Sequence, residues 1–197
     1  MPKVVDHDER RRSFLDALWR LAEKDEPFEP SIRKLAAEAG VSKSNVSHYF
    51  TTRADLLEAA VNDIVAGATG TASRLLSDAP DHDDFVVTVL SLLPLTPLER
   101  RRARVWRLLI SEQSDVDAEQ DLLARFNEHV QRGLRRMLEL MMARGLARAD
   151  LDLELESNRL QALIDGLSLR MLSNGDHLEH DTVRRIVDEH LRSLGAD

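Results

Sequence analysis

Residues 42–48 gather side chains that form hydrogen bonds, and their types suit contact with nucleic acid. The stretch reads SKSNVSH and contains Ser42, Lys43, Ser44, Asn45, Ser47 and His48. Serine, asparagine and histidine side chains hydrogen-bond to phosphates and base edges, and a lysine reaches a phosphate or a guanine. On a helical wheel with Val46 turned inward, Ser44 and His48 point outward. The pattern predicts a polar helix face directed at a nucleic acid.

The charge of this region differs from that of the chain as a whole. The 197 residues carry a net charge of -8, which argues against a general polyanion binder. Residues 31–53 contain four basic side chains and only Glu38 as an acid, a local balance of +3. The remainder beyond residue 58 holds 17 basic and 24 acidic residues, a balance of -7. We therefore expect a small positive surface on an acidic protein.

Two short helices joined by a turn are needed to position these side chains. Ser31 follows Pro30 and is a suitable N-cap for one helix, and Ser42 is a suitable N-cap for a second helix over 43–50. Gly40 fits the left-handed residue that ends the first helix. Two short helices joined by a turn with a glycine form a helix-turn-helix, here residues 31–50.

The rest of the chain predicts further helices and no strands. Apolar residues recur at helical spacing over about 8–24, from about 54 into the 70s, and over 83–93, 97–113, 118–145, 152–173 and 179–194. There is no cysteine, no apolar signal region at the N-terminus, and no apolar stretch long enough to span a bilayer. We expect an all-α, cytoplasmic protein that does not contact membranes.

The segment SIRKLAAEAGVSKSNVSHYFTTRADLLEAAV resembles the DNA-binding domain of the TetR family of transcriptional regulators. The family pattern of a serine or threonine, an Ala-Gly-Val-Ser turn, an aromatic-Phe pair and a following basic residue is met at residues 31, 39–42, 49–50 and 53. Many members have glycine at the position of Ser44 and a phosphate-binding tyrosine at the position of Ser47. Serine donates to phosphate with a shorter reach.

The resemblance implies a DNA-binding domain over 8–68 and a helical effector-binding and dimerisation domain over 69–197. The predicted DNA-binding residues are Ser31, Arg33, Ser42, Lys43, Ser44, Asn45, Ser47, His48, Tyr49 and Arg53. The two helix N-termini are also expected to present N–H groups to an anion. The three arginines at 10–12 are expected to lie along or inside a neighbouring minor groove, as basic arms do.

The C-terminal half is similar to the C-terminal domain of the choline-responsive betaine-pathway repressors, over ARVWRLLISEQ and the stretch from Phe126 to Ser173. This similarity implies a small-molecule effector but does not identify it, because related domains respond to different ligands. Candidate lining residues are Trp106, Leu109, Phe126, Val130, Met137 and Met141. Methionines and aromatics at helical spacing are also typical of an ordinary core.

Apolar residues on two sides of the helix over 152–173 predict two packing partners, one of them a symmetry mate. We expect this helix and the last helix to form a four-helix bundle with their copies in a two-fold homodimer. The predicted interface residues are Leu160, Leu163, Ile164, Leu167, Met171, Val183, Ile186, Val187 and Leu191. The alternative is a monomeric core.

Other chemistry finds little support in the sequence. The runs PDHDDF at 80–85 and HLEH at 177–180 contain metal-ligand types, but adjacent acids before an apolar run are more simply a helix N-terminus. The basic run at 99–104 fits a solvated helix face. No phosphate loop, nucleophile elbow or metal triad is found, so we expect no metal, no cofactor and no enzymatic activity.

These observations predict a transcriptional regulator that binds double-stranded DNA. We expect a repressor that is released from an inverted-repeat operator by a small-molecule effector. The alternative is a DNA-bound scaffold without a small ligand whose C-terminal surface recruits a protein.

Overall fold

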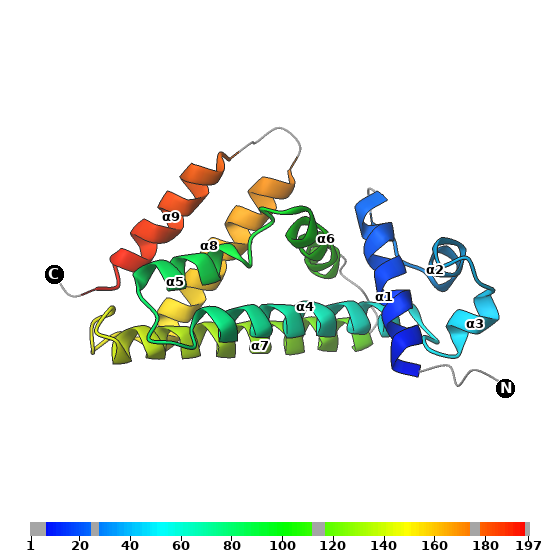
Figure 1. Cartoon of the computed structure of the whole chain (residues 1–197), viewed down its shortest axis with the longest axis horizontal. Coiled ribbons are helices and arrows are strands. Elements are labelled where there is room, and N and C mark those ends of the chain that lie inside the picture. The colour runs from blue at the N-terminus through cyan, green and yellow to red at the C-terminus, as the bar shows by residue number, and fades with distance from the viewer. Residues whose placement is uncertain (1–6, 25–27, 112–116, 174–177, 196–197) are drawn as a thin grey trace. The chain divides into compact units, whose positions relative to one another are not determined.

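The computed structural model describes residues 7–24, 28–111, 117–173 and 178–195. These residues form α-helices and no strands, which confirms the predicted fold class. The helices, labelled in Figure 1, are α1 (His7–Lys24), α2 (Ile32–Glu38), α3 (Lys43–Ser47), α4 (Arg53–Leu75), α5 (His82–Leu90), α6 (Pro97–Ser111), α7 (Asp117–Ala143), α8 (Leu153–Leu172) and α9 (His180–Arg192). None of the helices within these residues has the length and apolar content needed to cross a membrane.

Local capping sets the bounds of α2 and α3. The side chain of Ser31 accepts a hydrogen bond from the backbone N–H of Lys34, and that of Ser42 accepts one from Asn45. Gly40 has a φ of +66°, the left-handed conformation that lets the chain leave α2. Helix α3 ends at Ser47, three residues before the predicted end at 50. The helix-turn-helix therefore forms where the sequence predicts it.

The chain divides into two compact units, and the first joins residues from two separate parts of the sequence. It comprises the described residues of Met1–Ile64 together with those of Arg104–Leu122, and the second comprises Val65–Ala103 and Leu123–Asp197. The guanidinium of Arg104 on α6 donates to the carbonyl oxygens of Ala22 at 2.7 Å and Glu23 at 2.9 Å. These carbonyls end α1, so part of α6 belongs to this unit by capping it.

The core of the first unit lies between α1, α2, α3 and the start of α4. Its largest fully buried side chains are Phe14, Leu18, Leu35, Phe50, Leu56 and Leu57. The rings of Phe14 and Phe50 meet edge to face, with centroids 6.3 Å apart. Val46, the inward residue of α3, is completely buried. This packing fixes the orientation of α3, so its opposite side is turned to solvent.

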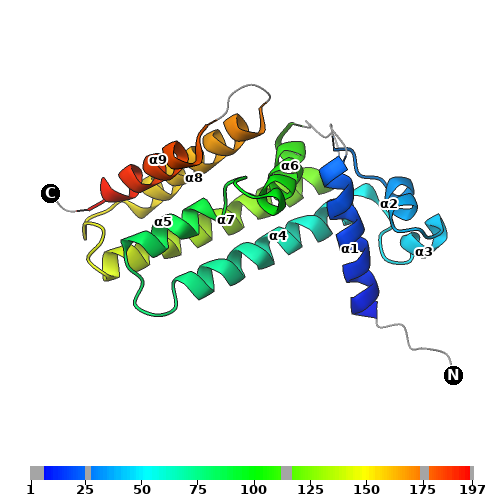
Figure 2. The ribbon, with the colours of Figure 1, turned by 45° about the horizontal axis from the view of Figure 1, so that its top comes forward.

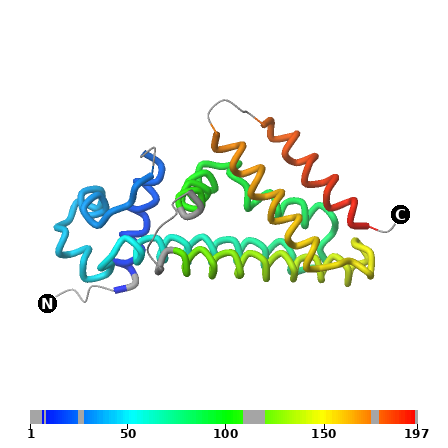
Figure 3. The backbone as a smooth tube through the Cα atoms, turned by 180° about the vertical axis from the view of Figure 1, so that it is seen from behind, coloured from blue at the N-terminus to red at the C-terminus, as the bar shows by residue number. Residues whose placement is uncertain are grey.

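The second unit has its own apolar core between α5, α7, α8 and α9. Figure 2 shows α8 and α9 running alongside each other. Phe85 and Val89 of α5, Leu138 of α7 and Val187 of α9 are completely buried in this core. Seen from behind in Figure 3, α8 meets α7 near the start of α8 and diverges from it toward Leu172.

Six of the residues predicted at a dimer interface lie in this core. They are Leu160, Ile164, Leu167, Val183, Val187 and Leu191, each at most 7% exposed. Their burial shows which side of α8 and α9 packs into the core of the chain, and their part in a dimer interface stays a prediction. Leu163, Met171 and Ile186 are half-buried at the edge of the core, and their place in an interface stays a prediction.

The acidic run at 81–84 starts α5. Asp81 accepts hydrogen bonds from the backbone N–H groups of Asp83 and Asp84, and the side chain of Asp84 accepts one from the N–H of Asp81. This reciprocal capping box satisfies free N–H groups at the helix start. His82 and Asp188 of α9 pair at 2.8 Å, and Arg184 also binds Asp83. No cluster of metal-ligand side chains occurs in the part of the chain that the structure describes.

Candidate DNA-binding site

Helix α3 turns one side into the core and the other to solvent. Val46 is completely buried, whereas Lys43, Ser44, Ser47 and His48 are exposed and Asn45 is half-buried. The burial of these residues agrees with the predicted helical wheel, in which Val46 points inward and Ser44 and His48 point outward. The exposed side offers hydroxyl, amide, imidazole and ammonium groups, which is the range of donors and acceptors that base edges and phosphates need.

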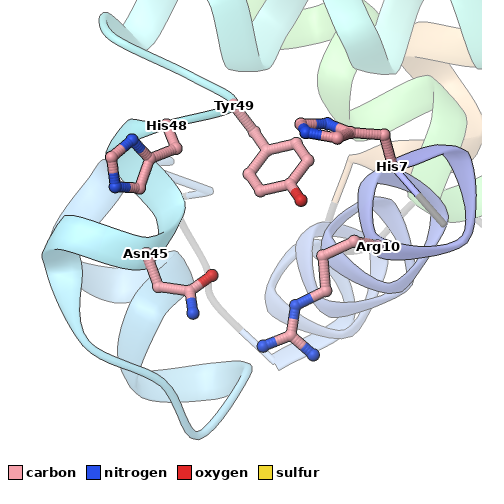
Figure 4. Close-up of a pocket in the computed structure, with 5 residues that line it drawn as sticks. All are labelled: His7, Arg10, Asn45, His48 and Tyr49. Carbon is pink, nitrogen blue, oxygen red and sulfur yellow. The ribbon is translucent and has the colours of Figure 1, made fainter. Parts of the chain in front are cut away.

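A hollow of about 500 Å³ lies between the start of α1 and α3. It is lined by His7, Arg10, Asn45, His48 and Tyr49. Figure 4 shows the Tyr49 hydroxyl, the Arg10 guanidinium and the Asn45 amide around the same space. Each of these groups donates hydrogen bonds, and the guanidinium is always charged. The hollow therefore suits a small anion such as a backbone phosphate.

Aromatic contacts hold Tyr49 at the wall of this hollow. Its ring lies 5.0 Å from the His7 ring and 5.2 Å from the Phe14 ring, measured between centroids. Phe14 is 1% exposed, so one side of the tyrosine is anchored to the core of the unit. His7 is a site residue that the sequence analysis missed, because only the packing of α1 against α3 brings residues 7 and 49 together.

The three arginines at 10–12 lie on helix α1, which is already helical at His7, so they do not form an extended arm. Arg10 lines the hollow, and its guanidinium carbon lies 5.5 Å from the Phe14 ring centroid. Arg11 lies over the Phe50 ring at 5.1 Å. Residues 1–6, where an arm would precede the helix, are outside the described residues.

The start of α4 is fixed by Asp55. The backbone N–H groups of Thr51 and Thr52 donate to its carboxylate at 2.7 and 2.9 Å. The bond from Thr52 is the main cause that holds the pKa of Asp55 below its usual value, and the charge of Arg11 adds to it. This cap positions Arg53, a predicted DNA-binding residue, at the first residue of α4.

The one acid of the positive region is paired within the unit. Glu38 accepts hydrogen bonds from Lys24 at 2.9 Å and from Arg20 at 3.0 Å. The bonds from Lys24 and then Arg20 lower the pKa of Glu38. Its negative charge is therefore matched locally, and Arg33 and Lys43 keep a positive surface around the turn.

Ser31 and Ser42 cap their helices with their own side chains. Each Oγ accepts an N–H at the third helical position, at 3.2 Å for Ser31 and 3.3 Å for Ser42. A hydroxyl that accepts such a bond still has its own proton to donate. Both residues can cap a helix and donate to a phosphate, whereas these two N–H groups are already used.

The predicted effector residues fall into different environments. Trp106 is half-buried in the first unit, and the side chain of Leu109 is outside the described residues. Met137 and Met141 are 5% and 0% exposed in the core of the second unit. They pack in that core, and their part in an effector pocket stays a prediction. Phe126 and Val130 are half-buried on α7 and stay candidates.

Comparison with known proteins matches both parts of the chain to one family. Residues 14–60 match the model of the bacterial regulatory proteins of the tetR family, and residues 83–196 match that of the BetI-type transcriptional repressor C-terminal domain. The chain is similar to the HTH-type transcriptional regulator PksA of Bacillus subtilis, with 25% identity over 98% of this chain and 94% of that protein. It is also similar to the HTH-type transcriptional regulator BetI of Escherichia coli O127:H6, with 29% identity over 97% of this chain and 98% of the other.

Solved structures share the fold over nearly the whole length. A putative TetR-family transcriptional regulator from a Rhodococcus species superposes with a TM-score of 0.80 at 23% identity, covering 96% of this chain and all of the other. A putative transcriptional regulator from Saccharomonospora viridis in complex with choline superposes with a TM-score of 0.79 at 25% identity, covering 93% and 95% of the two chains. The exposed α3, the capped turn and the two matched models lead to one conclusion. The chain belongs to the TetR family of transcriptional regulators and carries a C-terminal part of the BetI type.

Proposed function

We propose that this regulator is a homodimeric repressor that reads an inverted-repeat operator with α3 and releases it when a small molecule binds the second unit. The observation that carries this proposal is α3 itself, since Val46 on one side is completely buried and the other side presents donors and acceptors beside a hollow lined by Arg10 and Tyr49. Two copies related by a two-fold axis would place their α3 helices in successive major grooves. A regulator of this kind acts in the cytoplasm.

The exposed residues of α3 divide into two roles in this proposal. Ser44 and His48 are exposed and Asn45 is half-buried beside them, and all three face the base edges. Lys43 and Ser47 reach bases or the adjacent phosphates. Around them, contacts with the DNA backbone fix the register. These come from His7, Arg10, Ser31, Arg33, Ser42, Tyr49 and Arg53.

The dimer would use a side of α8 that the chain does not cover. Leu155 and Leu169 are 46% and 48% exposed, and Ala162 between them is exposed as well. These residues follow helical spacing with Gly166, where a Cβ would meet nothing within 4 Å. A stripe of leucines and small residues lets a second copy approach closely. Leu163, Met171 and Ile186 would border it.

Release of the operator requires the effector to favour a conformation of the dimer in which the two DNA-binding domains no longer match the spacing of the half-sites. To move occupancy from mostly bound to mostly free, the effector must prefer the released state by about 5.5 kcal/mol. The BetI-type C-terminal part and the choline-bound neighbour support a small-molecule ligand, and choline is the first compound to test. A DNA-bound scaffold without a ligand is the competing function.

Selection of bound sequences from random DNA tests the proposal. The selected sites should be inverted repeats, and affinity for them should fall by about 10-fold or more in Arg33→Ala and in Lys43→Ala. Loss of a phosphate contact should also lower the slope of log affinity against log salt by about 1. Arg132→Ala, which removes an exposed arginine of α7, is the matched control and should bind as the wild type does.

Two outcomes would contradict this function. If no sequence is enriched, the chain does not read DNA. If sites are enriched and both basic variants bind them normally, DNA is read by another surface. Enriched sites that no added small molecule releases, together with a protein retained on the second unit, would favour the scaffold.

A further inference from the structure

The hollow between α1 and α3 has two histidines among its lining residues. His7 is the first residue of α1 and His48 directly follows α3, so residues far apart in the sequence border one space. Both side chains are exposed in the chain, and a ligand can reach them. Histidine is the kind of side chain whose charge ordinarily changes between pH 5 and 8. The hollow thus contains two groups of the type that makes binding depend on pH.

The described residues that line this hollow include no carboxylate. Besides the two histidines they are Arg10, Asn45 and Tyr49. Figure 4 shows His7 and Arg10 on α1, with Asn45 and His48 on the α3 side. The guanidinium of Arg10 is always charged, so a proton on either imidazole adds a like charge to the same space. In the free chain nothing in the lining offsets that added charge.

The acids of the neighbouring helices are placed or bound elsewhere. Helical spacing turns Glu9 away from the side of α1 that lines the hollow. Asp55 at the start of α4 is held by two backbone N–H groups and by the charge of an arginine of α1. Glu38 is bound by two basic side chains. The charged residues that flank α3, Lys43 and Arg53, are cations. A negative charge for the two imidazoles therefore has to come with a ligand.

We propose that His7 and His48 bind the operator in their protonated form, so that the chain takes up protons with DNA and operator affinity rises as the pH falls. This inference rests on the proposed operator-binding function and adds control by pH at the same site. A phosphate in the hollow brings the negative charge that the lining lacks, and an opposite charge nearby favours the protonated imidazole. A protonated imidazole donates from both ring nitrogens, so His48 can bind a phosphate and a base edge together.

Ring packing keeps one of the imidazoles at the hollow before DNA arrives. The ring of His7 lies 5.0 Å from that of Tyr49, measured between centroids. Tyr49 in turn lies 5.2 Å from the ring of Phe14, which is 1% exposed. A side chain that is already held in place loses less conformational entropy when it binds. His7 is therefore positioned to meet a phosphate without a rearrangement of α1.

The experiment measures the affinity of the full chain for the duplex selected from random DNA, between pH 6 and pH 8 at one fixed salt concentration. Uptake of one proton with binding changes the log of the affinity by about 1 for each pH unit. With two imidazoles in each chain, we expect binding to be about 10-fold or more stronger at pH 6 than at pH 8. Calorimetry at pH 7 in phosphate and in Tris counts the protons, because each proton taken up adds the ionisation heat of the buffer.

Variants then assign the effect to the two imidazoles. His7→Gln and His48→Gln keep a hydrogen-bonding side chain that cannot take up a proton. Each should lose part of the gain in affinity between pH 8 and pH 6, and the double variant should lose most of it and take up almost no protons. His180→Gln, which removes an exposed histidine of α9, is the matched control and should keep the wild-type pH profile. All three histidines are exposed, so the melting temperatures should stay near that of the wild type.

The outcomes separate this inference from the proposed function. Operator binding of equal strength at pH 6 and pH 8 would overturn the role of the two histidines and leave the DNA-binding function standing. A pH profile that the double variant keeps would do the same, because the protons would then be taken up elsewhere. If the chain binds no duplex at any pH, the operator-binding function fails and this inference fails with it.

Discussion

The two units use polar side chains in opposite ways. In the first unit the hydrogen-bonding residues of α3 are exposed, while Val46 and Phe50 behind them are completely or almost completely buried. In the second unit, polar residues such as Gln131 and Asp165 are half-buried between helices. An exposed polar surface on a rigid core suits repeated recognition of one fixed shape. Half-buried polar groups between helices bind one another instead, as Gln131 does with Gln161.

The charges follow the same division. The first unit pairs its inner acid Glu38 with Lys24 and Arg20, which leaves the turn positive. The second unit leaves Asp165 without a cationic partner among the described residues. The positive surface around the turn attracts a polyanion. The residues beyond 58 have a net balance of -7 and repel it. Recognition of DNA is confined to one place by this contrast.

The largest effect is expected from removing the support of α3. Phe50→Ala deletes a ring that is 1% exposed and should destabilise the first unit by about 3–5 kcal/mol. Operator binding should be lost at physiological temperature while the second unit stays folded. Thermal unfolding followed by circular dichroism should then show an early transition that the wild type lacks. A single unfolding transition at the wild-type temperature would show that Phe50 does not stabilise the first unit separately from the second.

The proposed dimer predicts the next largest effect. Gly166→Arg should convert the dimer to a monomer of 22.3 kDa. Operator binding should weaken, because each DNA-binding domain then binds its half-site alone. In one chain a Cβ at this position meets nothing within 4 Å, so the fold itself tolerates the change. Gly133→Arg on α7 is the control, since a Cβ there also meets nothing and the residue is exposed. Light scattering after size exclusion gives both masses, and a variant that remains dimeric would place the interface elsewhere.

A moderate effect is expected where α6 caps α1. Arg104→Met removes two charged hydrogen bonds to the end of α1 and should cost about 1–3 kcal/mol of the stability of the first unit. Arg148→Met, which breaks an exposed ion pair with Asp150 at 3.5 Å, should cost much less. Urea unfolding of both variants measures the difference. Equal losses would mean that Arg104 is an ordinary surface residue.

The smallest effect is expected in the pH dependence of stability, to which Asp165 of the second unit contributes. Because burial raises the folded-state pKa of Asp165 to about 6, the protonated form is favoured by folding. Its contribution to stability is complete below the unfolded pKa near 3.8 and is lost as the pH rises through about 6. Asp165→Asn should therefore raise the melting temperature of the ligand-free protein at pH 7.5 and leave it nearly unchanged at pH 4. A variant that is less stable at pH 7.5 would show that the charge has a partner in the folded chain.

The sequence predicted features whose cause is local. Ser31, Gly40 and Ser42 act on residues within one turn, so the helix-turn-helix and its capping could be predicted to within a few residues. The spacing of Val46 and Phe50 gave the buried side of α3 for the same reason. Nothing in the spacing of His7 and Tyr49 shows that their rings meet, because that contact depends on how α1 packs against α3.

The remaining predictions needed information that periodicity does not contain. Helix α8 is apolar on two sides, and a helical wheel cannot tell which side the chain covers itself; Leu160 proved to be in the core and Leu169 outside it. The environment of Met141 could not be predicted for a similar reason, since a methionine at helical spacing packs equally well into a core or around a ligand. The bonds of Arg104 join residues 82 positions apart and leave no local pattern.

The most direct test is a crystal structure of the dimer bound to a selected operator. Our account predicts α3 in the major groove with Asn45 and His48 at hydrogen-bonding distance from base edges, and a phosphate oxygen between Arg10 and Tyr49. An α3 that faces away from the duplex, or a backbone that passes the α1–α3 hollow without contact, would contradict it.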